Sequence, residues 1–139
     1  MRFYEKEMGY FLMRLALGVN LFIHGVIRLG GNYDKFVNEE VAQFAASPLP
    51  EWSSNLFIHA IPCAEAVIGT LLILGLATRS VLVAGSLLMV CLIFGMGTLQ
   101  KWDVVSSQMI YVLFYSLLLS FAERNYYALD HWLGLKPRV

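Results

Sequence analysis

Four long apolar runs set the strongest constraint on what this chain can fold into. They cover residues 9–27, 55–76, 80–99 and 106–122. A helix needs about 20 mostly apolar residues to cross a bilayer, and backbone polar groups in lipid must be paired within the segment itself. We therefore predict an all-α integral membrane protein with four transmembrane helices.

The composition agrees with a membrane protein and argues against a soluble one. Hydrophobic residues make up 58% of the 139 residues and charged residues 14%, whereas soluble domains carry about 25% charged residues. We expect one transmembrane domain over residues 1–139, surrounded by a lipid bilayer. The formal net charge is zero, and no basic stripe is present, so we expect no nucleic-acid partner.

The two cysteines indicate neither a redox motif nor a metal site. Cys63 and Cys91 lie in separate apolar runs and form no C-x-x-C pair, which both a thioredoxin-like motif and a zinc site would need. We expect both to pack between helices, as buried free cysteines usually do.

Short links predict the direction of neighbouring helices. Residues 77–79 join the second and third runs, and residues 100–105 join the third and fourth. Helices joined so tightly lie antiparallel in bundles. The fold class predicted is therefore an antiparallel four-helix transmembrane bundle.

The connection over residues 28–54 is long enough to hold structure of its own. Glycines stand at its start and prolines near its end, which are turn signals. Apolar residues between them recur on one side of a helix, which predicts a short amphipathic segment across the mouth of the bundle, either a lid or a solvated loop. These residues are Phe36, Val37, Val41 and Phe44.

Lys and Arg outside the spans predict the orientation, because cytoplasmic loops carry an excess of them. Six lie on the side of the termini, and three lie on the side of the long connection. We expect a plasma-membrane protein with both termini in the cytoplasm and residues 28–54 outside. The six are Arg2, Lys6, Arg79, Arg124, Lys136 and Arg138; the three are Arg28, Lys35 and Lys101.

A short helix is predicted after the last span. Asn125 can cap its start, and Gly134 and Pro137 can end it. Its aromatic and apolar side chains suit the membrane interface, so we expect this C-terminal helix to lie flat on the inner surface. They are Tyr126, Leu129, Trp132 and Leu133.

Polar residues of the first run share one face of the predicted helix. They fall within roughly 120° at ~100° per residue, and an ionisable group in a span generally faces the bundle interior. We therefore place this face inward, with Gly18 beside it. The residues are Arg14, Asn20, His24 and Arg28.

Helix geometry places further polar residues at similar depth on other spans. His24 and His59 lie roughly 5 Å inside the outer ends of their helices, and Gln108 lies near the same level. Glu65 lies near the midplane, where it must be protonated, paired or hydrated. Arg14 can reach towards Glu65 in an extended conformation or can snorkel to the inner headgroups, and Arg28 can act as an interfacial anchor instead of a site residue.

Two sequence stretches resemble the DoxX family of small four-helix membrane proteins. The first reads Arg14-Leu-Ala-Leu-Gly18, followed by His24-Gly25 and Arg28, and the second runs from Glu65-Ala-Val-Ile-Gly69 to Gly75-Leu-Ala-Thr78-Arg79. The family includes the DoxD subunit of thiosulfate:quinone oxidoreductase. The resemblance implies a membrane partner of a redox enzyme, with Arg14, His24, Arg28, Glu65 and Arg79 as functional positions.

The leading hypothesis is a quinone-contacting subunit that is not a self-sufficient enzyme. Glu65 and His24 are the catalytic candidates, with Glu65 relaying a proton. Hydrogen-bond donors would hold the quinone oxygens, and thiosulfate, as the reductant, would favour Arg28 and Lys101. The ligand-binding candidates are Arg14, Arg28, His59, Gln108 and Arg79.

Two alternatives belong to other classes. One is a non-enzymatic scaffold, assembly factor or small-solute carrier that works in a homo-oligomer or with other membrane subunits. The other is a b-type haem held by His24 and His59. Quinone is the expected cofactor, and neither metal nor haem is expected.

Overall fold

Helices make up the regular secondary structure of residues 2–134, the part of the chain that the computed structural model describes. No strand occurs within these residues, which confirms the all-α prediction for them. Pro137, Lys136 and Arg138, used above for the last helix and the orientation, lie outside the described residues. The elements are α1 (Arg2–Leu29), α2 (Tyr33–Phe44), α3 (Glu51–Leu74), α4 (Thr78–Thr98), α5 (Trp102–Ser120), the 3₁₀ turn η1 (Ala122–Arg124) and α6 (Leu129–Trp132).

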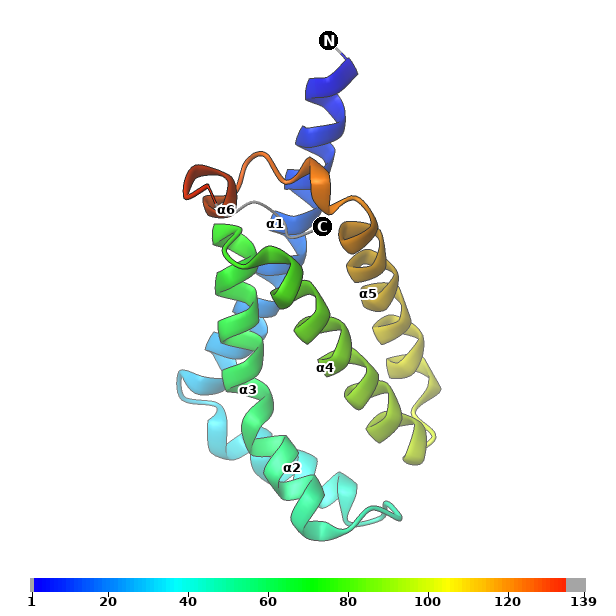
Figure 1. Ribbon diagram of the computed structural model, residues 1–139. Helices are drawn as coiled ribbons and strands as arrows, with labels where there is room; N and C mark the ends of the chain where they lie inside the picture. Colours follow the sequence, from blue (N-terminus) through cyan, green and yellow to red (C-terminus); the bar gives the residue numbers. More distant parts are fainter. Residues whose placement is uncertain (1, 135–139) are drawn as a thin grey trace.

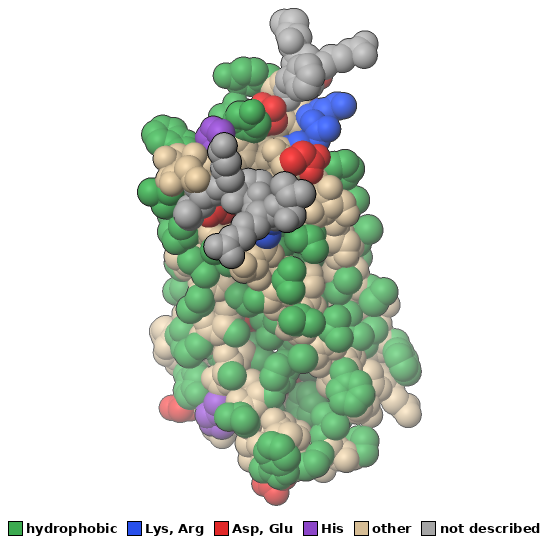
Figure 2. All heavy atoms as spheres, viewed as in Figure 1, with side chains coloured by type: hydrophobic (Ala, Val, Ile, Leu, Met, Phe, Trp, Pro, Cys, Tyr) green, Lys and Arg blue, Asp and Glu red, His purple; other side chains and the backbone are tan. Residues whose placement is uncertain are grey.

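Four of these helices are long and apolar enough to cross a membrane, as predicted. They are Tyr4–Leu29 within α1, and the whole of α3, α4 and α5. Each begins before the apolar run that predicted it, because polar residues continue the helix beyond its apolar part. Figure 2 shows hydrophobic side chains over the middle of the visible face, with most charged side chains towards its two ends.

Consecutive long helices run in opposite directions (Figure 1). The start of α1, the α3–α4 turn and α6 lie at one end of the molecule, here called the terminal end. Helix α2 and the α4–α5 turn lie at the opposite end, here called the α2 end. The helices contact each other chiefly as two pairs, α1 with α3 and α4 with α5.

Glycines bring α1 and α3 into backbone contact. A Cβ at Gly25 would lie 2.4 Å from the Ala66 nitrogen, and a Cβ at Gly69 would lie 2.4 Å from the Phe22 nitrogen. Small residues permit such close approach in membranes, where packing drives helix association. This contact fixes the position of the polar face of α1 relative to α3.

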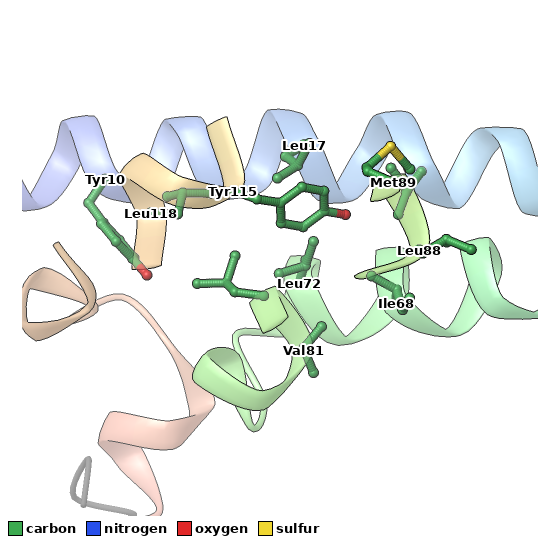
Figure 3. Close-up of a cluster of buried hydrophobic side chains, with 11 residues drawn as sticks. Tyr10, Leu17, Ile68, Leu72, Val81, Leu88, Met89, Tyr115 and Leu118 are labelled. Carbon is green, nitrogen blue, oxygen red and sulfur yellow. The ribbon is translucent and has the colours of Figure 1, made fainter. Parts of the chain in front are cut away.

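In the second pair, α4 and α5, an aromatic ring of one helix packs against a glycine of the other. A Cβ at Gly85 of α4 would lie 2.4 Å from the Tyr115 ring of α5. Tyr115 is fully buried in an apolar cluster that also holds Leu17 of α1 and Leu72 of α3. Figure 3 shows these side chains converging from the different helices. The cluster is therefore the place where the two pairs meet.

The C-terminal segment closes the terminal end over the α3–α4 turn. Gly75 ends α3 in the left-handed conformation, with φ of 66°. The Asp130 carboxylate accepts hydrogen bonds from the backbone N–H groups of Ala77 and Thr78, each at 2.7 Å. A carboxylate on the first N–H groups of α4 satisfies donors that have no partner within the helix.

The two cysteines do not pack between helices, contrary to the prediction. Cys63 and Cys91 are both exposed on the chain. On α3, Cys63 lies off the side formed by the buried residues Ile61, Glu65 and Ile68. An apolar run alone does not tell which side of a helix faces its neighbours.

Candidate functional site

A cavity of about 250 Å³ lies in the half of the molecule towards the α2 end. All five helices from α1 to α5 or the turns between them contribute to its lining. Its walls are apolar on the side of Ile61, Met89 and Leu92, and polar on the side of α1 and α2. We call it the α2 cavity.

An ion pair between α1 and α3 forms the centre of the polar wall. Arg28 Nη1 lies 2.5 Å from Glu65 Oε2. The Glu65 side chain is 8% exposed and the Arg28 side chain 28% exposed. A carboxylate at this depth in a span needs a partner, and Arg28 is that partner.

Helix α2 covers the cavity and contacts both helix pairs, the α1–α3 pair and the α4–α5 pair. The Arg28 guanidinium lies 4.5 Å from the centre of the Phe36 ring, a cation–π distance. Gln43 of α2 accepts a hydrogen bond from Lys101, which precedes α5. Burial raises the pKa of the Glu40 carboxyl above its ordinary value, while the nearby positive charges of Lys101 and Arg28 partly oppose this.

Two polar groups on α5 face the cavity from the other side. The Tyr111 hydroxyl accepts a hydrogen bond of 3.0 Å from Asn20 Nδ2, so its own proton is available to a ligand. Gln108 is buried, and its Oε1 has no hydrogen-bond partner in the part of the chain described. Buried polar atoms normally have a partner, so this acceptor suits a bound ligand.

Four of the residues predicted from the sequence line the α2 cavity together: His24, Arg28, Glu65 and Gln108. His59 lies outside its lining. The His59 Nδ1 is 2.7 Å from the Asn55 carbonyl oxygen, and its ring meets Tyr33 edge to face at 6.0 Å. Six residues of helix turn His59 about 120° away from Glu65, so the structure does not bring both histidines to one cavity.

Two other predicted residues lie at the terminal end. Arg14 is fully buried and donates to the carbonyl oxygens of Leu72 and Ile73 at the end of α3, and to that of Tyr127 at 2.5 Å. It therefore neither pairs with Glu65 nor reaches the headgroups. Arg79 is exposed in the first turn of α4.

Several cavity residues were not among the sequence-based candidates. Tyr111 lies three residues after Gln108 on α5, a spacing that puts both on one face of a helix. That spacing could have identified Tyr111 as a candidate from the sequence. Glu40 and Gln43 lie on α2, and their side of that helix could not be assigned before α2 was placed over the cavity.

The charges that line the cavity balance one another. Arg28 is paired with Glu65, and Lys101 lies near Glu40. The remaining polar residues of the lining lie on α1, α2 and α5, and none of them is Asp, Glu, Lys or Arg. The arrangement therefore suits a small neutral ligand with polar oxygens. Among residues 2–134, no three His, Cys, Asp or Glu side chains gather in a way that could hold a metal ion.

Comparison with known families shows to which family this chain belongs. The DoxX family model matches residues 9–104. The chain belongs to the DoxX family. The match includes His24, Arg28 and Glu65 of the α2 cavity and ends before Gln108 and Tyr111. Comparison with curated proteins and with solved structures gives no match.

Membership of the DoxX family confirms the resemblance drawn from the Arg14 and Glu65 stretches. Each of the two stretches contributes residues to both ends of the structure. Glu65 and Arg28 line the α2 cavity, whereas Arg14 and Gly75 hold the turn at the terminal end. The DoxX residues of this chain therefore comprise a cavity group and a structural group.

Proposed function

We propose that this DoxX-family protein binds a quinone headgroup in the α2 cavity and exchanges electrons with a partner redox subunit. The observation that carries the proposal is the combination of a balanced ion pair, Arg28 with Glu65, and two neutral hydrogen-bonding groups on α5. Ligand sites combine apolar walls with a few placed polar groups and usually measure about 300–1,000 Å³. A cavity of about 250 Å³ suits one ring rather than a larger cofactor.

The residues present fit the chemistry of a quinone. When bound, a quinone supplies a carrier that takes up two electrons and two protons. The Tyr111 hydroxyl, already accepting from Asn20, can donate to a carbonyl oxygen. The unpartnered Oε1 of Gln108 can accept from a hydroxyl of the reduced form.

Glu65 and His24 are the groups that can hold a proton beside the ligand. Both line the α2 cavity. Glu65 is hydrogen-bonded to Arg28, so the carboxylate is held in one orientation and its negative charge is balanced. A carboxyl and an imidazole within one cavity provide two sites for general acid and base work.

The same charges argue for a neutral ligand over thiosulfate. Arg28 is engaged by Glu65, and Lys101 donates to Gln43. A divalent anion would have to displace the carboxylate from Arg28 and would add two negative charges to a balanced cavity. We therefore place any anionic reductant on the partner subunit.

The proposal includes a position in the membrane. The Lys and Arg distribution favours a plasma-membrane bundle with both termini in the cytoplasm. Helix α2 is then the amphipathic segment over the outer mouth, and α6 lies at the inner interface. The exposed apolar sides of α4 and α5 face lipid, a second copy or the redox partner.

Calorimetric titration of the protein in nanodiscs with a short-tailed quinone tests this function. We expect saturable binding, weakened several-fold by Tyr111→Phe, because one hydrogen bond to a ligand contributes about 1 kcal/mol. Tyr126→Phe, at an exposed tyrosine of the terminal end, is the matched control and should leave binding unchanged. Glu65→Gln should bind the quinone but lose proton-coupled turnover with a reductant.

Two results would overturn the proposal. One is the absence of saturable quinone binding by the parent protein. The other is equal binding by the Tyr111→Phe and Tyr126→Phe variants. Either result would favour the non-enzymatic alternative, in which the chain acts as a scaffold, assembly factor or carrier.

A further inference from the structure

A second hollow lies at the terminal end of the molecule, away from the α2 cavity. It measures about 390 Å³ and lies between the first turns of α1 and the last turns of α5. Its walls include Met13 of α1, Leu117 of α5 and Phe121 just after α5. We call it the terminal groove.

The missing side chain of Gly9 leaves the groove open. Gly9 lines it, and a Cβ built there would meet nothing within 4 Å. Lys6, Gly9 and Met13 follow the i, i+3, i+7 spacing of one helix face. On this face of α1 the cation Lys6 therefore lies nearest the N-terminus, and the uncharged residues Gly9 and Met13 follow it inward.

Two cations line the groove, one from each of its sides. Lys6 lies on α1 and is exposed, and Arg124 ends η1 just after α5. Arg124 Nε lies 3.6 Å from Glu123 Oε1, so part of its charge is already balanced. Lys6 makes no ion pair with any described residue and adds a full positive charge to the same groove.

The cations lie where the apolar spans end. The apolar run of α1 begins at Gly9, and α5 ends at Ser120, so Lys6 and Arg124 lie just outside the two spans, both at the terminal end. The apolar wall residues lie deeper in the same two helices. This order of charge and apolar surface matches a phospholipid, whose phosphate lies at the interface and whose acyl chains extend inward.

We propose that the terminal groove binds one phospholipid with an anionic headgroup. Lys6 and Arg124 contact the phosphate and the headgroup charge, and an acyl chain lies along Met13, Leu117 and Phe121. Tyr10 also lines the groove. The bound lipid links α1 to the end of α5, and this role is independent of quinone binding.

Native mass spectrometry of the protein during stepwise delipidation tests the proposal, with phosphatidylglycerol and phosphatidylcholine as probes. We expect one phosphatidylglycerol per chain to remain and to bind several-fold more tightly than phosphatidylcholine. Replacing both Lys6 and Arg124 by Gln should weaken phosphatidylglycerol binding about 25-fold, since each cation near the surface contributes about five-fold. Gly9→Leu should fill the groove and weaken binding of both lipids.

Lys35→Gln is the matched control, because it removes an exposed cation at the α2 end. It should leave lipid binding unchanged. Equal retention of the two lipids by the parent protein would overturn the proposal. So would equal lipid binding by the Lys6→Gln/Arg124→Gln variant and the control, or a protein dimer through this face that Gly9→Leu dissociates. The cation variant keeps Gly9 and the apolar residues of the groove, so the proposal stays testable if Gly9→Leu fails to fold.

Discussion

Arg28 of α1 and Glu65 of α3 form an ion pair, with Nη1 and Oε2 2.5 Å apart, beside a close backbone contact of the two helices. Gly25 lies three residues before Arg28, and Ala66 follows Glu65 directly. The packing of Gly25 on Ala66 therefore sets the separation at which the two charges meet. Helix α2 covers this pair but does not create it.

The ion pair should contribute to stability as a coupled unit. Glu65→Leu should lower the free energy of unfolding by about 3 kcal/mol, because it leaves Arg28 without its carboxylate in a largely buried position. Arg28→Leu should act similarly. The double variant should be at least about 1 kcal/mol less destabilised than the sum of the two. Unfolding in detergent micelles measures all three, and strictly additive losses would contradict the coupling.

The glycine contact between α1 and α3 should tolerate no added side chain. Gly25→Ala would place a Cβ 2.4 Å from the Ala66 nitrogen, so we expect a loss of about 3 kcal/mol as the backbones move apart. Gly97→Ala is the matched control, because its Cβ would meet nothing within 4 Å. The Gly97→Ala protein should be as stable as the parent or gain about 1 kcal/mol in free energy of unfolding from helix propensity. Thermal unfolding of both variants checks this, and equal effects would refute the close contact.

Docking of α2 should weaken as the pH rises. Burial raises the pKa of Glu40 in the folded chain, so the docked helix binds a proton more tightly than the free helix. Docking is then strongest below the ordinary pKa of a Glu, about 4.3. It weakens as the pH rises through the raised pKa. Hydrogen exchange of α2 amides at pH 4 and pH 7.5, corrected for intrinsic rates, measures the change.

Glu40→Gln is the control for that pH effect. It should keep α2 protected at both pH values, although Glu65 and His24 line the same cavity. Parent-like loss of protection in this variant would assign the pH effect to another group. Lys101 and Arg28 carry the positive charges that oppose the raised pKa of Glu40.

The sequence predicted the four spans because each long apolar run has one stable solution in lipid, a helix. It also predicted that His24, His59 and Gln108 lie at similar depth, since depth along a helix follows directly from residue number. His24 and Gln108 line one cavity together with Arg28 and Glu65, whereas His59 lies outside it. The α-helical pattern was therefore sufficient where depth and helix face decide the outcome.

What the sequence did not predict depends on contacts between segments far apart in the chain. Arg14 bonds to carbonyl oxygens at the end of α3 and to Tyr127, which no helical wheel of α1 can indicate. The partner of Glu65 was open between Arg14 and other groups until α1 and α3 were packed together. Glu40 entered the site because α2 folds back over the cavity.

The orientation in the membrane can be tested by cysteine labelling. Asn38 on α2 and His131 on α6 are both exposed and lie at opposite ends of the molecule. In a background with Cys63 and Cys91 replaced by Ala, an impermeant thiol reagent on intact cells should label Asn38→Cys. It should label His131→Cys only after permeabilisation. The reverse pattern would invert the proposed topology.

The Asp130 carboxylate should hold the C-terminal segment to the start of α4. It accepts from the N–H groups of Ala77 and Thr78, and loss of such a capping group costs about 1–2 kcal/mol. Asp130→Ala should lower the free energy of unfolding by that amount and speed hydrogen exchange at both amides. Glu39→Ala, which removes an exposed acid on α2, should do neither, because exposed ion pairs contribute little. Unchanged exchange at Ala77 and Thr78 in the Asp130→Ala protein would show that α4 begins without this cap.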